Sequence, residues 1–281
     1  MRDLDGRPEL CAINTATLGF TAPIGQVIEA VARHGFGGIA PWRREIEGHD
    51  VKAIARHIGD AKLKVTGYCR STFIPAATVR DFRANIEANK KAIADAATLG
   101  AESFVMVVGG LAPGSKDIAA ARRQVAEATA ELLSHGREHG VRIALEPLHP
   151  VYAADRSCLS TIDEALDLCD RLAPAAEKML GVCLDVYHIW WDPKLEDAID
   201  RAKGRIAAFH VCDWLLDTKD VLNDRGMMGD GVIAIPAIRA LVEKARYRGL
   251  IEVEIFSAAD WWTRPIEETL EVCKERLATV C

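Results

Sequence analysis

Eight short apolar runs alternate with longer segments of helical periodicity, and this alternation constrains the fold more than any other feature of the chain. Several runs are apolar almost throughout, which is typical of parallel strands that are covered on both faces. The segments between them repeat apolar residues at three- and four-residue spacing, which predicts amphipathic helices. The predicted strands are Leu10–Asn14, Gly38–Trp42, Val65–Cys69, Ser103–Val108, Arg142–Glu146, Gly181–Tyr187, Ile206–Val211 and Ile251–Phe256.

Capping residues mark the predicted helix ends. Thr161 and Glu164 have the spacing of a capping box at a helix N-terminus. Glycines stand where several helices are expected to end, namely Gly35, Gly100, Gly140, Gly204 and Gly249. The clearest helices are predicted over Val79–Leu99, Ile118–His135, Thr161–Leu172, Ile235–Arg246 and Ile266–Val280.

The number and order of these units predict a single α/β domain over residues 1–281. Eight strand–helix units match a closed (β/α)8 TIM barrel, which typically takes about 250 residues. An open, doubly wound sheet is the structural alternative. Such a sheet usually carries a glycine-rich phosphate loop after its first strand, and the segment Asn14–Phe20 contains none.

Composition limits the binding partners and the cellular compartment that we expect for this protein. The net charge of −6 argues against a nucleic-acid-binding surface, which needs a basic patch. No apolar run reaches the roughly 18 residues that cross a bilayer, and Met1–Leu10 lacks the apolar core of a signal peptide. The eight cysteines form no CxxC pair, so we expect buried thiols in a reducing cytoplasm.

Four polar side chains stand at the ends of the last four predicted strands. They are Glu146, Asp185, His210 and Glu254. In a TIM barrel the carboxyl ends of the strands meet at one rim, where catalytic residues gather. Three carboxylates that converge there repel one another unless a cation lies between them. The set therefore predicts one divalent metal ion, and Mn²⁺, Mg²⁺, Co²⁺ and Zn²⁺ all suit it.

Five motifs around these residues resemble the xylose isomerase-like TIM-barrel superfamily of sugar isomerases and epimerases. The resemblance extends over almost the whole chain, and strands 3 and 8 look most similar to inosose-isomerase-like members. It rests on Leu145-Glu146-Pro147, Asp185-Val186-Tyr187-His188, Phe209-His210-Val211, Gly229-Asp230-Gly231 and Val253-Glu254-Ile255-Phe256.

The resemblance implies the same four metal ligands, with His188 and Arg225 in contact with substrate. It also implies a small carbohydrate or cyclitol substrate and a homo-oligomer. Isomerising or epimerising a ketose removes a proton from the carbon beside a carbonyl, which takes a base, and a metal ion can stabilise the enediolate charge. We expect Glu146 and Glu254 to be these bases, while His188 and Arg225 polarise the substrate oxygen.

Three further residues are candidates for substrate contacts, each with a structural alternative. Arg70 follows strand 3 and could bind a hydroxyl or phosphate, or form an ion pair at the rim. Asn14 could bind a sugar hydroxyl or cap a turn, and Trp42 could stack on a sugar or lie in a subunit interface. No segment forms a dedicated phosphate cradle, which favours a non-phosphorylated substrate.

Other functions remain open to different degrees. A keto-sugar or inosose dehydratase would use the same metal and bases, so the sequence separates this lyase poorly from an isomerase. A nuclease similar to endonuclease IV needs extra histidines after strands 3 and 4, where Tyr68-Cys69-Arg70 and Val108-Gly109-Gly110 stand instead. A barrel without catalytic activity is disfavoured by the intact ligand set.

Overall fold

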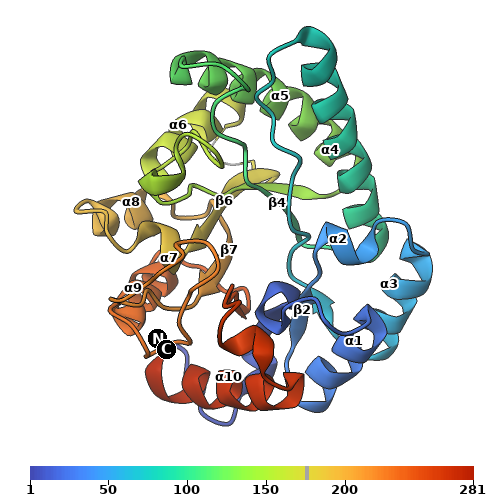
Figure 1. Cartoon of the computed structure of the whole chain (residues 1–281), viewed down its shortest axis with the longest axis vertical. Coiled ribbons are helices and arrows are strands. Elements are labelled where there is room, and N and C mark those ends of the chain that lie inside the picture. The colour runs from blue at the N-terminus through green and yellow to red at the C-terminus, as the bar shows by residue number, and fades with distance from the viewer. Residues whose placement is uncertain (175–176) are drawn as a thin grey trace.

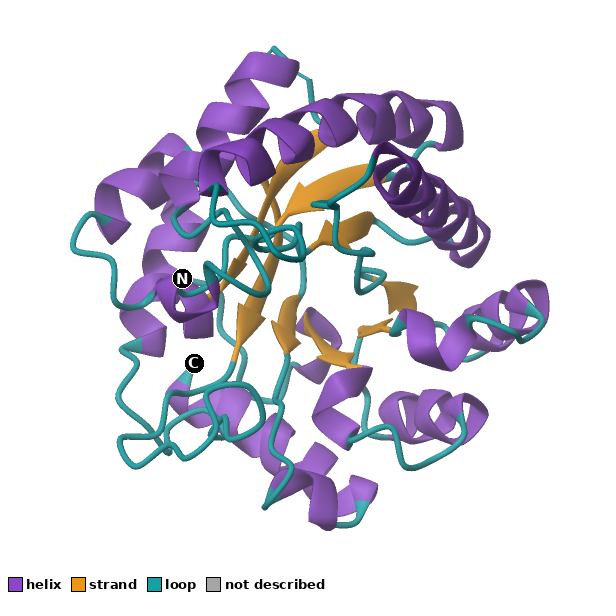
Figure 2. Ribbon diagram, turned by 45° about the horizontal axis from the view of Figure 1, so that its top comes forward, coloured by secondary structure: helices purple, strands orange, loops and turns teal. Residues whose placement is uncertain are grey.

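The computed structural model describes residues 1–174 and 177–281 and shows eight parallel strands surrounded by helices (Figures 1 and 2). This arrangement confirms the predicted single-domain TIM barrel. The strands are β1 (Cys11–Asn14), β2 (Gly38–Ala40), β3 (Lys64–Val65), β4 (Ser103–Met106), β5 (Arg142–Leu145), β6 (Leu180–Asp185), β7 (Ile206–Val211) and β8 (Ile251–Val253).

The strands form one sheet in the order β3-β2-β1-β8-β7-β6-β5-β4. The two ends of this sheet meet beyond β3, where Tyr68 forms a parallel bridge to Phe104. The Tyr68 N–H donates to the Ser103 carbonyl (2.9 Å), and the Val105 N–H donates to the Tyr68 carbonyl (3.1 Å). The carboxyl ends of all the strands therefore surround one axis.

Most predicted strands are correct in place but too long. Pro41 follows β2 and has no N–H for the ladder, so the regular strand stops at Ala40 rather than at Trp42. β6 stops at Asp185 because the Asp185 carboxylate accepts the Tyr187 N–H (2.9 Å) and begins a short helix. Apolar character continues past these points because the following residues are still buried.

Helices separate the strands and cover the outside of the barrel (Figure 2). They are α1 (Ile24–Arg33), α2 (Arg43–Ile46), α3 (Val51–Asp60), α4 (Val79–Leu99), α5 (Ile118–His139), α6 (Ile162–Leu172), α7 (Val186–Ile189), α8 (Leu195–Arg201), α9 (Ile235–Lys244) and α10 (Ile266–Val280). Short 3-10 turns lie at Pro8–Leu10, Thr15–Leu18, Pro150–Tyr152 and Trp261–Thr263.

The predicted caps are mostly confirmed. The Thr161 hydroxyl accepts the Glu164 N–H at the start of α6 (3.1 Å). Gly100 and Gly140 end α4 and α5 in the left-handed conformation, which glycine adopts without steric cost. The prediction for Gly249 was wrong, because α9 ends at Lys244.

The two chain ends meet beside α9, as Figure 1 shows. The Arg239 side chain is 1% exposed and donates to the backbone carbonyls of Arg2 and Cys281. It also pairs with Glu243 (3.1 Å). One buried guanidinium thus ties the first and last segments of the barrel together.

All eight cysteines are buried and unpaired, as predicted. Among the described residues, no helix combines the length and apolar character needed to cross a membrane.

Candidate active site

The four predicted metal ligands converge at the carboxyl ends of β5 to β8. Glu146 follows β5, Asp185 ends β6, His210 lies in β7, and Glu254 follows β8. All four side chains are at most 5% exposed, and each has a ligand atom within 4.8 Å of one from each of the others. The strand order places these residues together because β5, β6, β7 and β8 are consecutive neighbours in the sheet.

A fourth carboxylate, that of Glu252, lies beneath this group and contacts the far side of the imidazole. Nδ1 of His210 faces the rim, 3.4 Å from Glu254 and 3.6 Å from Glu146. Nε2 of the same ring lies 3.2 Å from Oε1 of Glu252. Glu252 also accepts from Asn14 (2.9 Å) and Thr66 (2.6 Å), so its carboxylate is held in place. Glu252 therefore faces the interior of the barrel and is paired.

The two glutamates of the group differ in their protonation. Burial and the neighbouring Glu254 raise the pKa of Glu146 to about 8. Burial also favours the neutral form of Glu254, but His210 and Arg225 outweigh it and lower the pKa of Glu254. Without a metal ion, Glu254 is therefore ionised near neutral pH and Glu146 is largely protonated.

Arg225 and His188 lie against the ligand group, as the sequence predicts. Arg225 donates to Asp185 (Nη1 to Oδ2, 2.8 Å), and its Nη2 faces Nε2 of His188 at 3.3 Å. Burial and the adjacent Arg225 hold the pKa of His188 well below its usual range. His188 is thus neutral, and its Nδ1 is a buried atom with no hydrogen-bond partner in the described part of the chain.

A cavity of about 280 Å³ opens directly above Glu146 and Glu254. Arg70 and Trp42 line it, as do His188 and Arg225. This volume lies near the lower end of the range for ligand pockets, about 300–1,000 Å³. The space suits a small molecule rather than a polymer.

Asn14 does not line this cavity. It is fully buried, and Oδ1 accepts from the Ala16 N–H (3.1 Å) and from Trp42 Nε1 (2.7 Å). Nδ2 donates to Glu252 (2.9 Å). Of the two alternatives for Asn14, the structure shows the capped turn, and all the polar atoms of its side chain are used inside the protein.

Trp42 is a predicted residue of the cavity, whereas Phe20, Arg44 and Arg156 were not predicted. An aromatic wall is made by Phe20, Trp42, Phe256 and Trp262, whose rings contact one another in edge-to-face or tilted pairs. Arg44 and Arg156 also line the cavity, although both lie in segments that look like ordinary polar surface in the sequence. Arg44 lies in α2 shortly after β2, and Arg156 lies in the loop after β5, so the signal that could have identified them is their position after a strand.

The donor set fits a divalent cation. Three buried carboxylates and one imidazole converge, and the imidazole nitrogen that faces them has one further contact, to the Cys183 thiol at 3.7 Å. A second group, Glu146, Cys183 and His210, overlaps the first and adds a thiol. Burial keeps the pKa of Cys183 well above its ordinary value, so this thiol is protonated in the protein as described.

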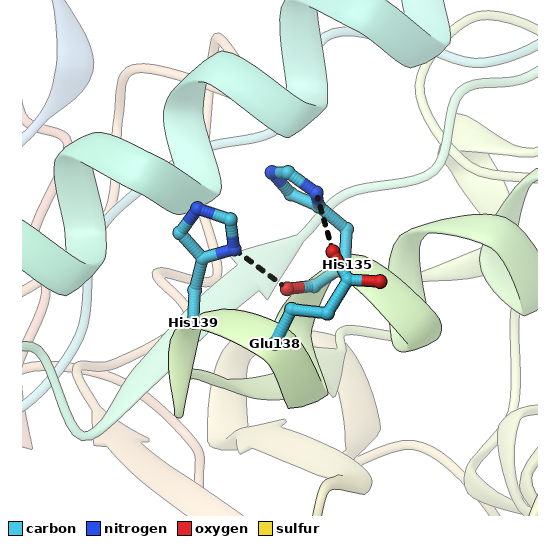
Figure 3. Close-up of side chains that lie close together, drawn as sticks. All are labelled: His135, Glu138 and His139. Carbon is cyan, nitrogen blue, oxygen red and sulfur yellow. Dashed lines mark hydrogen bonds and ion pairs between the residues drawn. The ribbon is translucent and has the colours of Figure 1, made fainter.

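A separate histidine pair lies at the other end of the barrel. Figure 3 shows His135, Glu138 and His139 close together near the end of α5. Glu138 lies 3.7 Å from His135, and His139 Nδ1 contacts the His135 carbonyl (3.0 Å). Because α5 ends where β5 begins, this group is remote from the cavity.

The fold and the site together define a class of protein, namely (β/α)8 barrels with a buried carboxylate–histidine centre at the carboxyl ends of their strands. The model of the xylose isomerase-like TIM-barrel family matches residues 28–276. The chain belongs to this family. No sequence among the curated proteins matches the chain.

Solved structures with this fold include proteins of several kinds. Protein SMc04130 from Sinorhizobium meliloti 1021 is 45% identical over 98% of this chain and 99% of its own, with a TM-score of 0.94. The IOLI protein with a bound zinc atom is 18% identical over 96% of this chain and 97% of its own, with a TM-score of 0.82. A D-psicose 3-epimerase with D-fructose is 17% identical over 95% of this chain and 96% of its own, with a TM-score of 0.77. The last two likenesses show the shared fold.

Proposed function

We propose that this protein is a divalent-metal-dependent isomerase or epimerase of a sugar or cyclitol. The observation that supports the proposal best is the convergence of Glu146 and Glu254 at the floor of a cavity for a small molecule, together with Asp185 and His210. Two solved structures of the same fold support it. The IOLI protein structure contains a zinc atom, and the other protein is a D-psicose 3-epimerase.

Glu146, Asp185, His210 and Glu254 would hold the metal ion, which when bound would supply a positive charge beside the substrate's oxygens. Glu146 and Glu254 then act on the carbon next to the carbonyl. One carboxylate takes the proton, and the other, after it has taken up a proton from water, returns that proton to the same or the adjacent carbon.

His188 and Arg225 complete the polar side of the cavity. Neutral His188 has its Nε2 turned to Arg225, so its proton lies on Nδ1, which can donate to a substrate oxygen. Arg225 holds Asp185 and leaves Nε without a partner among the described residues. A donor that is already oriented costs no reorganisation when negative charge develops on the substrate.

The aromatic wall excludes water from the reacting carbon. Phe20, Trp42, Phe256 and Trp262 present ring faces and edges to the cavity. Such surfaces suit the C–H face of a sugar or cyclitol ring. They also protect a reactive intermediate from side reactions.

The test is solvent-exchange NMR with metal-loaded protein in D₂O and a panel of ketoses, keto-acids and inososes. Deuterium that enters the carbon next to the carbonyl, with formation of an isomer, supports the proposal. The Glu254→Gln variant should lose exchange, and the surface variant Glu275→Gln should keep it. Loss of water from the substrate instead would identify a dehydratase. Absence of exchange with every compound, despite bound metal, would refute the isomerase assignment.

A further inference from the structure

Three arginines line the cavity above the candidate metal centre. Arg44 lies in α2, Arg70 follows β3, and Arg156 lies in the loop after β5. They come from three separate βα segments, and the barrel brings them to one opening. Among the described residues, the carboxylates that line the same cavity are those of Glu146 and Glu254 at its floor.

These guanidinium groups lack close carboxylate partners in the described chain. Arg70 makes one long hydrogen bond, from Nη1 to the Ser71 carbonyl (3.4 Å). The nearest carboxylate to Arg156 is Asp155, at 3.6 Å, and Arg44 has no ion pair within residues 1–174 and 177–281. The adjacent Arg43 differs, since it pairs with Glu47 at 2.5 Å.

Aromatic rings hold the arginines without neutralising them. The Arg44 guanidinium lies 4.4 Å from the centre of the Phe20 ring, and that of Arg70 lies 4.5 Å from the Phe73 ring. Arg156 lies 5.9 Å from the Tyr152 ring. Stacking on a ring face leaves the N–H edge of the guanidinium free for an anion.

A divalent ion together with Arg225 would offset the carboxylates of Glu146, Asp185 and Glu254, and only Glu252, beneath His210, would remain. The three rim arginines carry more positive charge than this one carboxylate, so positive charge is in excess at the cavity. Burial, and then the neighbouring cations Arg156 and Arg43, lower the pKa of Arg70.

We propose that the substrate carries an oxyanion, either a carboxylate or a phosphate, on the end remote from the reacting carbon, and that Arg70 and Arg156 bind it with Arg44 at the rim. This inference rests on the proposed function only in that the anion is taken to be part of a substrate. The anion-binding site in the cavity is inferred independently of that function. A planar guanidinium forms paired hydrogen bonds with either oxyanion. The excess charge attracts such a molecule although the whole chain carries −6.

The test compares three probes that share one carbon skeleton: D-fructose, D-fructuronate and D-fructose 6-phosphate. Inorganic phosphate serves as a probe that fits regardless of substrate size. Binding is followed by the fluorescence of Trp42 and Trp262, which line the cavity, in metal-free and in Mn²⁺-loaded protein. The variants are Arg70→Gln, Arg156→Gln and the charge-retaining Arg70→Lys. Arg80→Gln is the control. The Arg80 side chain is 89% exposed, pairs with Asp81 and does not line the cavity.

An anionic probe should bind at least about tenfold more tightly than D-fructose, since hydrogen bonds to charged groups are the stronger class. Arg70→Gln and Arg156→Gln should remove this preference, Arg70→Lys should retain part of it, and Arg80→Gln should retain all of it. The tighter of the two anionic probes then identifies carboxylate or phosphate as the preferred group.

Equal or tighter binding of D-fructose overturns the inference, as does a preference that survives both glutamine substitutions. Absence of saturable binding for every anion, inorganic phosphate included, overturns it as well. An anion preference that depends on Arg70, in a protein without any solvent exchange, would uphold the anion site and refute the isomerase proposal instead.

Discussion

Glu252 is the residue whose substitution should reveal most about how the barrel prepares its metal centre. Its carboxylate lies 3.2 Å from Nε2 of His210, on the opposite side of the ring from the three candidate carboxylate ligands. A carboxylate in this position fixes the orientation of a ligand histidine and raises its basicity. We predict that Glu252→Gln weakens metal binding without unfolding the protein.

The structure indicates the size of this effect. In Glu252→Gln, the amide oxygen can replace Oε1 and still accept from Asn14 and face His210. The amide nitrogen can donate to Thr66, whose hydroxyl then turns to the Ile39 carbonyl (3.5 Å). Only the negative charge is lost, and this should weaken metal affinity about tenfold, or about 1.4 kcal/mol. Glu252→Ala also removes the carboxylate that accepts from Asn14 Nδ2 and from Thr66, and should cost up to about 100-fold.

The assay is a competitive titration of Mn²⁺ or Zn²⁺ against a fluorescent chelator. All proteins carry His135→Ala and His139→Ala, so that the surface histidine pair on α5 does not contribute. Glu275→Gln is the matched control, because Glu275 is exposed. Metal affinity of Glu252→Gln within twofold of the parent, with an unchanged melting temperature, would refute the positioning role.

Four further predictions follow from the same geometry. Glu254→Gln should lower kcat of the isomerisation about 10²- to 10⁴-fold, the usual range for a general base, and an unchanged kcat would exclude Glu254 as that base. Divalent metal at about 100 times its Kd should raise the melting temperature by about 5 °C, measured by calorimetry, and no rise would argue against the site. Because the pKa of Glu146 is raised to about 8 in the metal-free protein, metal binding must displace its proton. Affinity in the chelator titration should therefore fall up to about tenfold per unit as pH drops below 8, and affinity that is constant from pH 8 to 6 would contradict this protonation. Arg239→Leu should lower the free energy of unfolding, measured in urea, by about 3 kcal/mol, because it removes a partner of buried Glu243 and the link between the chain ends. A loss below about 1 kcal/mol would show that Arg2 alone is enough to pair Glu243.

The sequence predicted the barrel because its signals are local. Runs such as Ile206–Val211 are apolar and β-rich whatever surrounds them, and their bounds agree with β7. Strand ends were less predictable, as β6 shows. The apolar pattern continues past Asp185, but the Asp185 side chain accepts the Tyr187 N–H. Asp185 is therefore the last residue of β6 and the N-cap of α7. Cytoplasmic location, homo-oligomerisation and the identity of the metal stay predictions.

The candidate ligands could also be predicted from the sequence, but the cavity above them could not. Parallel strands place their carboxyl ends at one rim, so Glu146 and Glu254 had to converge once the fold was known. Loop side chains follow no such rule. Asn14 turned inward because Glu252 and Trp42 bind it, whereas Arg156 reached the opening although nothing in its local sequence indicates this.

The sequence by itself thus determined the eight-fold strand–helix repeat and the residue types at the strand ends, because both depend on short-range patterns and on the alternation of parallel strands. Only the tertiary structure decided the contacts between residues far apart in the chain. It placed Glu252 beneath His210, turned Nε2 of His188 to Arg225, and brought arginines from separate loops to one cavity. These contacts depend on how the barrel closes, and no local pattern records that closure.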